Sequence, residues 1–318
     1  MAGLFAAGVV APLVRDRQGI ILRLRLASGE KSLAKFCRPS RRPSSNGGGI
    51  RNESLTTLLH KNVSFFRASL LWWLLCGLGW RAGAGEADEL IKSGDAHDQR
   101  FETKAALADY LAAIPLATNR AALYWKIAKQ YVDSMGDATT EAAKKKLSLT
   151  ALDYALKSVA AEPQNERSRV ALAIAYGKAS NFADNRTRVK YSREVREQAL
   201  EAIRLDPKDD LGYFVLGRWN YEVAGFNSFL RALVKVMYGG LPSASNDEAI
   251  RNYKKAIQLA PDKPMHHYHL GRAYQVSKRA KLAAEEYRKA LALPVRLRDD
   301  FEVKEKAKLH LKEVEAEN

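Results

Sequence analysis

The stretch that decides the fold runs from Leu211 to Leu259 and reads LGYFVLGRWNYEVAGFNSFLRALVKVMYGGLPSASNDEAIRNYKKAIQL. Its two ends have the apolar spacing of two amphipathic helices, and residues 227–246 form an oversized insertion between them. The stretch from Pro264 to Leu293 has the same pattern without the insertion. In both, a small residue lets two helices approach, an aromatic residue fills the gap, and alanines on the second helix keep the pair tight. Each stretch therefore predicts a helical hairpin.

The same pattern recurs from residue 85 onward and gives five hairpins. Each has a small residue on its first helix and an alanine ladder on its return helix, although only the return helix is clear in the first. The marker residues are Ala106, Tyr110 and Ala113; Ala128, Ala151 and Ala155; Ala173, Ala199 and Ala202; Gly217, Ala249 and Ala256; and Gly271, Ala283 and Ala290. This spacing is typical of tetratricopeptide repeats, whose unit is about 34 residues. The sequence predicts an all-α, tetratricopeptide-like α-solenoid over residues 85–318.

The turns inside these hairpins depart from the standard repeat. The second and third hairpins carry extra charged, helix-forming sequence, which we expect to lengthen their return helices. The insertion of the fourth hairpin predicts a short extra helix that ends at Gly239-Gly240 and Pro242. After the fifth hairpin, Asp299 to Glu317 reads as an amphipathic helix with Phe301, Ala307 and Leu311 on one side. We expect it to cap the last exposed apolar face.

Residues 1–84 form a separate leader. The first sixty residues are Arg- and Ser-rich and have the composition of a disordered segment. A basic flank, a short apolar run over residues 68–80 and the small residues Ala82-Gly83-Ala84 then match a secretory signal peptide. The run is too short for a bilayer-spanning helix, which needs about 20 residues. Three interpretations stay open: an export signal preceded by residues that are not translated, an organellar transit peptide with a short anchor, or a buried helix of the array.

The positive charge is concentrated in this leader. Of the formal net charge of +16, residues 1–84 contribute +10. The repeat region is therefore only mildly basic, and we expect no nucleic-acid partner. Both cysteines, Cys37 and Cys76, also lie in the leader, so the repeat region offers no disulfide or cysteine metal site.

The elongated turns, taken in order, point to a particular family. The chain from about Ala87 to Glu313 resembles the regulator of microtubule dynamics family of tetratricopeptide-like proteins. The resemblance is carried by LYWKIAKQYVD (Leu123 to Asp133), AIRLDPKDDLGYFVLGRWNYEVAG (Ala202 to Gly225), YGGLPSASNDEAI (Tyr238 to Ile250) and KALALP (Lys289 to Pro294). It implies a non-catalytic α-solenoid associated with microtubules or spindle poles, with some members at mitochondria and one implicated in lipid binding. The leader, which looks like a bacterial export signal, departs from the family.

The first helices of the hairpins predict a binding groove. In a solenoid these helices line the concave face, and helical steps place one set of residues on it. The predicted groove residues are Trp125, Lys129, Val132, Val170, Ile174, Phe214, Arg218, Tyr221, Tyr268, Arg272 and Gln275. The aromatic residues would give apolar contact, and Lys129, Arg218 and Arg272 would meet a carboxylate or phosphate. The alternative is that these side chains are interior packing.

Three functions follow from these patterns. A protein- or peptide-binding scaffold predicts an open groove, a lipid-binding module predicts an apolar cavity closed by residues 227–238, and a structural domain predicts a filled groove. No nucleophile–base pair, phosphate loop or zinc spacing is present, so we expect no enzyme activity, cofactor or metal. His266, His267 and His269 do not share one helix face. The protein is exported if the signal over residues 61–84 is real. In the family's compartments, namely cytoplasm, cytoskeleton, spindle or mitochondrion, microtubules become a partner if the host is eukaryotic.

Overall fold

The structure is a computed structural model that describes residues 85–316. Contacts divide the chain into two units, Met1–Leu74 and Leu75–Asn318, and all described residues belong to the second. Within residues 85–316 every regular element is a helix. After a helix over residues 85–99, they are α2 (Thr103–Ala113), α3 (Arg120–Asp133), the 3₁₀ turn η2 (Ser134–Gly136), α4 (Glu141–Ala161), α5 (Glu166–Ser180), α6 (Asn185–Leu205), α7 (Asp210–Ala224), α8 (Ser228–Tyr238), α9 (Asn246–Leu259), α10 (Pro264–Val276), α11 (Ala280–Ala292) and α12 (Asp299–Ala316).

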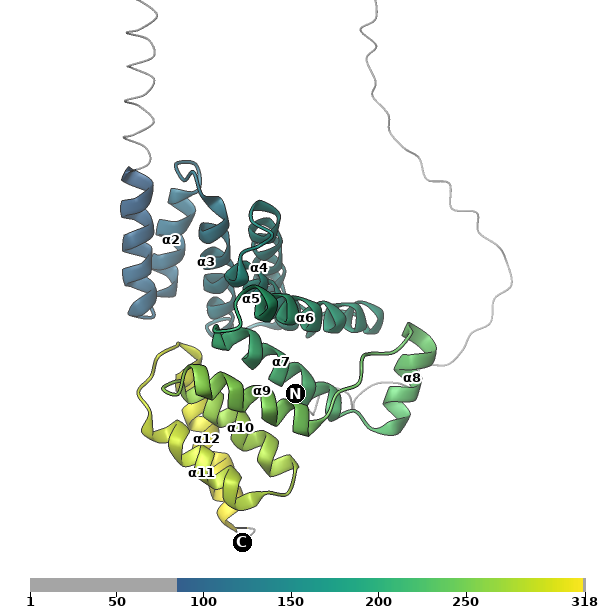
Figure 1. Cartoon of the computed structure of the whole chain (residues 1–318). Helices are drawn as coiled ribbons and strands as arrows, with labels where there is room; N and C mark the ends of the chain where they lie inside the picture. Colours follow the sequence, from purple (N-terminus) through teal and green to yellow (C-terminus); the bar gives the residue numbers. More distant parts are fainter. Residues whose placement is uncertain (1–84, 317–318) are drawn as a thin grey trace, which may run out of the picture. The chain divides into compact units, whose positions relative to one another are not determined.

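These helices pack as five successive hairpins, which confirms the predicted solenoid (Figure 1). The helix over residues 85–99 pairs with α2, α3 pairs with α4, α5 with α6, α7 with α9, and α10 with α11. The first helices of neighbouring hairpins also contact one another, α3 with α5, α5 with α7, and α7 with α10. They form the concave face of such an array, which we call the first-helix face.

A close approach of helices holds three of the hairpins together. A Cβ atom at Gly94, Gly217 or Gly271 would lie only 2.5, 2.9 or 2.6 Å from the ring of Tyr110, Tyr253 or Tyr287. Only glycine leaves room for the tyrosine ring of the return helix at these positions. The three tyrosines are almost completely buried and belong to the apolar cores.

The elongated turns have the predicted structures. The extra residues of the second and third hairpins extend α4 and α6, each of 21 residues. The insertion of the fourth hairpin forms the short helix α8, which ends at Gly239 and Gly240, both with positive φ. Such left-handed residues end helices at little cost only when they are glycine.

The C-terminal helix caps the array in part as expected. α12 packs against α10 and α11, and it buries Val303, Ala307 and Val314. Leu311 packs against the same core. Phe301 does not belong to this buried side: it is 56% exposed, and its ring meets Phe101 edge-on at 5.6 Å. The first turn of α12 therefore extends beyond the hairpin that it caps.

Candidate functional site: the first-helix face

The start of α12 crosses the first-helix face and connects both ends of the array. Arg298, just before α12, donates hydrogen bonds to Thr103 Oγ1 at 2.8 Å and to Asp137. Asp299 Oδ2 lies 3.9 Å from Lys178 Nζ of α5. Because α12 also rests on α10, the predicted groove is bridged by the protein's own C-terminal helix.

At one end of this face, Lys129 is already neutralised. Its Nζ lies 2.6 Å from Asp98 Oδ1 and 2.8 Å from Asp133 Oδ2, and Gln130 also donates to Asp98. Burial alone would lower the pKa of Lys129, but the two carboxylates outweigh it and raise the pKa. Trp125 and Val132, on the same helix, are half-buried. Lys129 thus stabilises the packing of α3 on the preceding helix, and its charge is already balanced by two carboxylates of the protein.

At the other end, the predicted residues contact α12. The Arg272 guanidinium lies 4.8 Å from the centre of the Tyr221 ring and donates to Tyr221 Oη at 3.1 Å. Gln275 Oε1 accepts a hydrogen bond from Tyr287 Oη at 2.6 Å and lies 3.2 Å from His310 Nδ1 of α12. The Tyr268 ring is buried and lies 5.9 Å from the His310 ring. Tyr268 and Gln275 thus form part of the surface on which α12 packs.

Three predicted groove residues belong to the interior. Val170, Phe214 and Tyr268 are buried. Phe214 packs against the rings of His266 and His269, with centroids 5.0 and 5.2 Å away. Interior packing therefore describes these residues: Phe214 packs against α10 of the next hairpin, and Tyr268 packs against α12.

The centre of the face has a different character. Arg218 of α7 and Ile174 of α5 are half-buried there, and Lys178 of α5 lies beside them. Burial lowers the pKa of Lys178, and the nearby charge of Arg218 acts in the same direction, while Asp299 opposes both. Arg218 forms no ion pair or hydrogen bond with any residue in the described part of the chain. This leaves one unpaired guanidinium next to a weakly paired ammonium group.

Lys178 was missed by the sequence reasoning. It lies five residues after the small residue Ala173, one helical step beyond the predicted set. The equivalent positions of the second and fourth hairpins hold Asp133 and Glu222, so a recurring charge at this position was the available signal. The predicted set contains only residues one after, four after and three before the small residue of each first helix.

The three histidines of α10 serve the packing of neighbouring helices. His266 Nε2 lies 2.6 Å from Asp210 of α7, and His267 Nδ1 lies 2.6 Å from Glu286 of α11. Each of these carboxylates contacts a single histidine, and no group of three metal-ligating side chains occurs among the described residues. Burial lowers the pKa of both His266 and His269.

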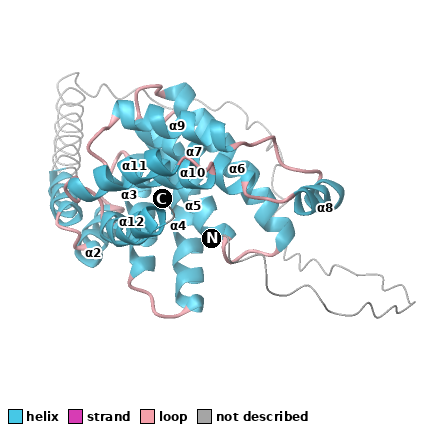
Figure 2. Ribbon diagram, turned by 90° about the horizontal axis from the view of Figure 1, so that it is seen from below, coloured by secondary structure: helices cyan, strands magenta, loops and turns pink. Residues whose placement is uncertain are grey.

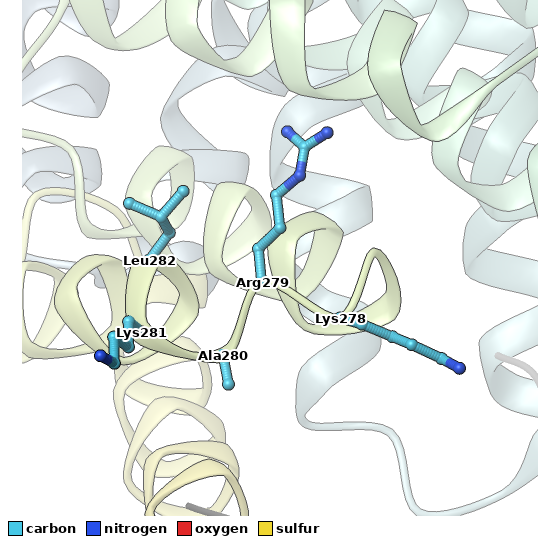
Figure 3. Close-up of a pocket in the computed structure, with 5 residues that line it drawn as sticks. All are labelled: Lys278, Arg279, Ala280, Lys281 and Leu282. Carbon is cyan, nitrogen blue, oxygen red and sulfur yellow. The ribbon is translucent and has the colours of Figure 1, made fainter.

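A shallow recess of about 320 Å³ lies at the turn between α10 and α11 (Figure 3). Lys278, Arg279, Ala280, Lys281 and Leu282 line it. The side chains of Lys278 and Lys281 extend in opposite directions, and Arg279 reaches Asp247 of α9 at 3.3 Å. The three cations do not converge, so the recess provides no anion site.

Comparison with known proteins identifies the family. The sequence model described as Regulator of microtubule dynamics protein 1-3 matches residues 85–315. The chain belongs to the regulator of microtubule dynamics family. It is 27% identical to regulator of microtubule dynamics protein 1 of Mus musculus over 187 residues, which are 58% of this chain and 61% of the relative. It is 28% identical to protein 3 of Xenopus laevis over 55% of this chain and 37% of the relative.

The chain thus matches less than two thirds of the length of these relatives. Among solved structures, a thermophilic tetratricopeptide-repeat protein of Thermus thermophilus, TTC0263, superimposes with a TM-score of 0.52 over 71% of this chain and 99% of its own. At 19% identity this similarity shows the fold alone. None of the helices within residues 85–316 has the length and the apolar character of a membrane-spanning segment.

Proposed function

We propose that this chain is a non-catalytic interaction scaffold that binds an acidic segment of a partner protein at the centre of the first-helix face. The observation that carries the proposal is the guanidinium of Arg218, which has no ion pair within residues 85–316 and lies beside Lys178. A half-buried cation without a carboxylate partner favours an incoming carboxylate, which gains a charge-assisted hydrogen bond there. Lys129 and Arg272, the other predicted cations, are already bonded within the protein.

The chemistry of α12 supports an acidic partner. Its first turn contains Asp299, Asp300 and Glu302. A hydrogen bond from Lys306 lowers the pKa of Glu302, and the charges of Lys178 and Arg218 contribute in the same direction. The protein's own acidic turn therefore lies at the cations that a partner would use. A partner segment would bind beside it or compete with it.

Membership of the family makes the microtubule surface the first partner to test. The relatives named above come from animals, which supports the cytoplasm, cytoskeleton or mitochondrion as the compartment. The predicted export signal over residues 61–84 lies outside the described residues and stays a prediction.

A lipid or other amphiphile in the same groove is the alternative function. Its apolar part would need exposed aromatic side chains, and Phe214 and Tyr268 are buried. The insertion that was expected to close an apolar cavity forms α8, which packs beside the return helix α6. Both observations count against a lipid in this groove.

The test is co-sedimentation of the full chain with microtubules. Arg218→Glu is expected to lower the affinity by about tenfold or more, since it turns an attractive contact into a repulsive one. Lys281→Glu makes the same change in net charge on the exposed face of α11 and serves as the matched control. Loss of binding in both variants, or in neither, would contradict the proposal. α4 carries the run Lys144-Lys145-Lys146, a second basic surface. Loss of binding through Lys145→Glu instead would place the site on that helix.

A further inference from the structure

The helix α8 carries an apolar stripe that nothing in the described part of the chain covers. Phe229, Leu233, Val236 and Met237 are 75%, 44%, 82% and 60% exposed. At about 100° per residue these four positions lie on one side of the helix. Val234, on the other side, is the buried residue of α8. The stripe therefore faces away from the body of the protein.

Polar contacts at both ends hold α8 in place. At its start, Asn227 Oδ1 accepts from the backbone N–H of Leu230, and Arg231 donates to the carbonyl oxygens of Ala224 and Phe226, each at 2.9 Å. At its end, Arg193 of α6 donates to the carbonyl oxygens of Gly240 and Tyr238. An isolated helix of this length is marginal in water. These contacts present a preformed amphipathic helix with its apolar side outward.

The surroundings of the stripe are basic. No acidic residue occurs between Glu222 and Asp247, and Lys235 of α8 is exposed. Arg186 and Lys190, both exposed, lie on the same stripe of α6 as Arg193, although Glu197 follows beyond it. Figure 2 shows α8 at the margin of the described unit, beside α6, and the two helices are in contact.

We propose that α8 is a membrane-docking helix that inserts Phe229, Leu233, Val236 and Met237 into the interface of an anionic lipid bilayer, with Lys235, Arg186 and Lys190 meeting the headgroups. Interfacial helices combine an apolar side with flanking cations in this way. Four side chains over two helical turns are far from the roughly 800 Å² per partner of a stable protein interface.

The site is independent of the proposed groove, because α8 lies beside a return helix and Arg218 lies on the first-helix face. A membrane surface could thus be bound while the groove holds another partner. The helix would lie in the interface and would not span the bilayer.

The test measures the environment of α8 rather than membrane binding of the whole chain, because every variant of the full chain also contains the apolar run over residues 68–80. In a Cys37→Ser, Cys76→Ser background, Met237→Cys is labelled with an environment-sensitive dye. Leu149→Cys, on the exposed side of α4, is the matched control position. Vesicles of phosphatidylcholine alone and of phosphatidylcholine with phosphatidylserine are added to each.

The dye at position 237 is expected to shift to the blue with the anionic vesicles, and the dye at position 149 is expected not to shift. Phe229→Ser with Val236→Ser should weaken the partitioning on the order of tenfold or more, and Lys190→Glu with Lys235→Glu should make it insensitive to phosphatidylserine. Both pairs are exposed, so the fold should be retained, as circular dichroism would show. No shift with the anionic vesicles overturns the proposal, and so does an equal shift with neutral ones. A shift that depends on protein concentration without vesicles would assign the stripe to a second copy of the chain.

Discussion

The hairpins at the two ends of the solenoid and those in its middle fill the same gap in two ways. In the first, fourth and fifth hairpins a glycine on the first helix faces a tyrosine on the return helix. In the second and third, the equivalent positions hold Ala128 with Ala155 and Ala173 with Ala199. A tyrosine ring on the return helix thus occurs where the first helix has no Cβ, because the ring takes the space that a methyl group would need.

The polar contacts between hairpins differ in the same way. In the middle, Ser158 Oγ donates to the carbonyl oxygen of Ala121 and lies 2.7 Å from Ser168 Oγ. Between the fourth and fifth hairpins, His266 contacts Asp210. The middle joint contains no titratable group in these contacts, whereas the C-terminal joint does. The two regions should therefore respond differently to changes in volume and in pH.

The largest loss of stability is expected when one of the tyrosines between paired helices is removed. Tyr253→Ala should lower the free energy of unfolding by about 3–5 kcal/mol, because Tyr253 is fully buried and Gly217 cannot fill the cavity that is left. Denaturant unfolding of the full chain, followed by circular dichroism, measures this change. An effect below that of an exposed substitution such as Leu156→Ala would show that the hairpin collapses around the gap.

The next effect tests whether glycine and tyrosine are matched. Alanine favours a helix over glycine by about 1 kcal/mol, so Gly217→Ala would stabilise an isolated α7. In the protein we expect a net loss of about 1–2 kcal/mol, because the new Cβ would lie 2.9 Å from the Tyr253 ring. In the Tyr253→Ala background the same change should become neutral or stabilising. Additive effects in this double-mutant cycle would contradict the matching.

A smaller effect is expected on acidification, and it should be confined to the C-terminal region. Burial lowers the folded-state pKa of His266, and it lowers that of His269 well below the usual range. On acidification the unfolded chain therefore protonates these histidines at a higher pH than the folded chain does. Stability is then fully present above the unfolded pKa of about 6.5 and falls as the pH drops, by at most about 1.4 kcal/mol per histidine and pH unit.

Hydrogen exchange between pH 7 and 5.5, corrected for intrinsic rates, should show lost protection in α7 and α10 but not in α4 and α5. His269→Phe should reduce the loss, because the ring would still pack against Phe214 and the nearby charges of Arg218, Arg272 and Lys306 would no longer face an imidazolium. The pKa of Asp210 is about 2, since hydrogen bonds from His266 and Lys263 outweigh its burial. The stability that ionised Asp210 contributes is lost only when the pH falls below its unfolded pKa of about 4.

The smallest effect is expected in the middle of the array. Ala173→Gly should cost about 1 kcal/mol, mainly through helix propensity, because Ala199 opposite is too small to move into the space. Thermal unfolding against the wild-type chain measures it. A loss as large as that of Tyr253→Ala would mean that the middle hairpins depend on the same close fit as the outer ones.

The sequence by itself determined the repeat. Small residues, alanine ladders and helix-ending glycines act within one hairpin, so their spacing gave five hairpins, the long helices α4 and α6, and the short helix α8. The first helix, over residues 85–99, was not recognised, although Gly94 occupies its small position. Its partner residue, Tyr110, lies on α2.

Tertiary structure decided whether the predicted groove is open or covered. Helical steps predicted that Arg218, Tyr221 and Arg272 share one face, but they could not predict the path of α12 across it. That path depends on contacts such as Arg298 with Thr103, between residues nearly two hundred positions apart, and no local pattern encodes them. The same holds for the outward side of α8. Its apolar residues are visible in the sequence, whereas their exposure follows from the way Arg193 and Val234 fix the helix against α6.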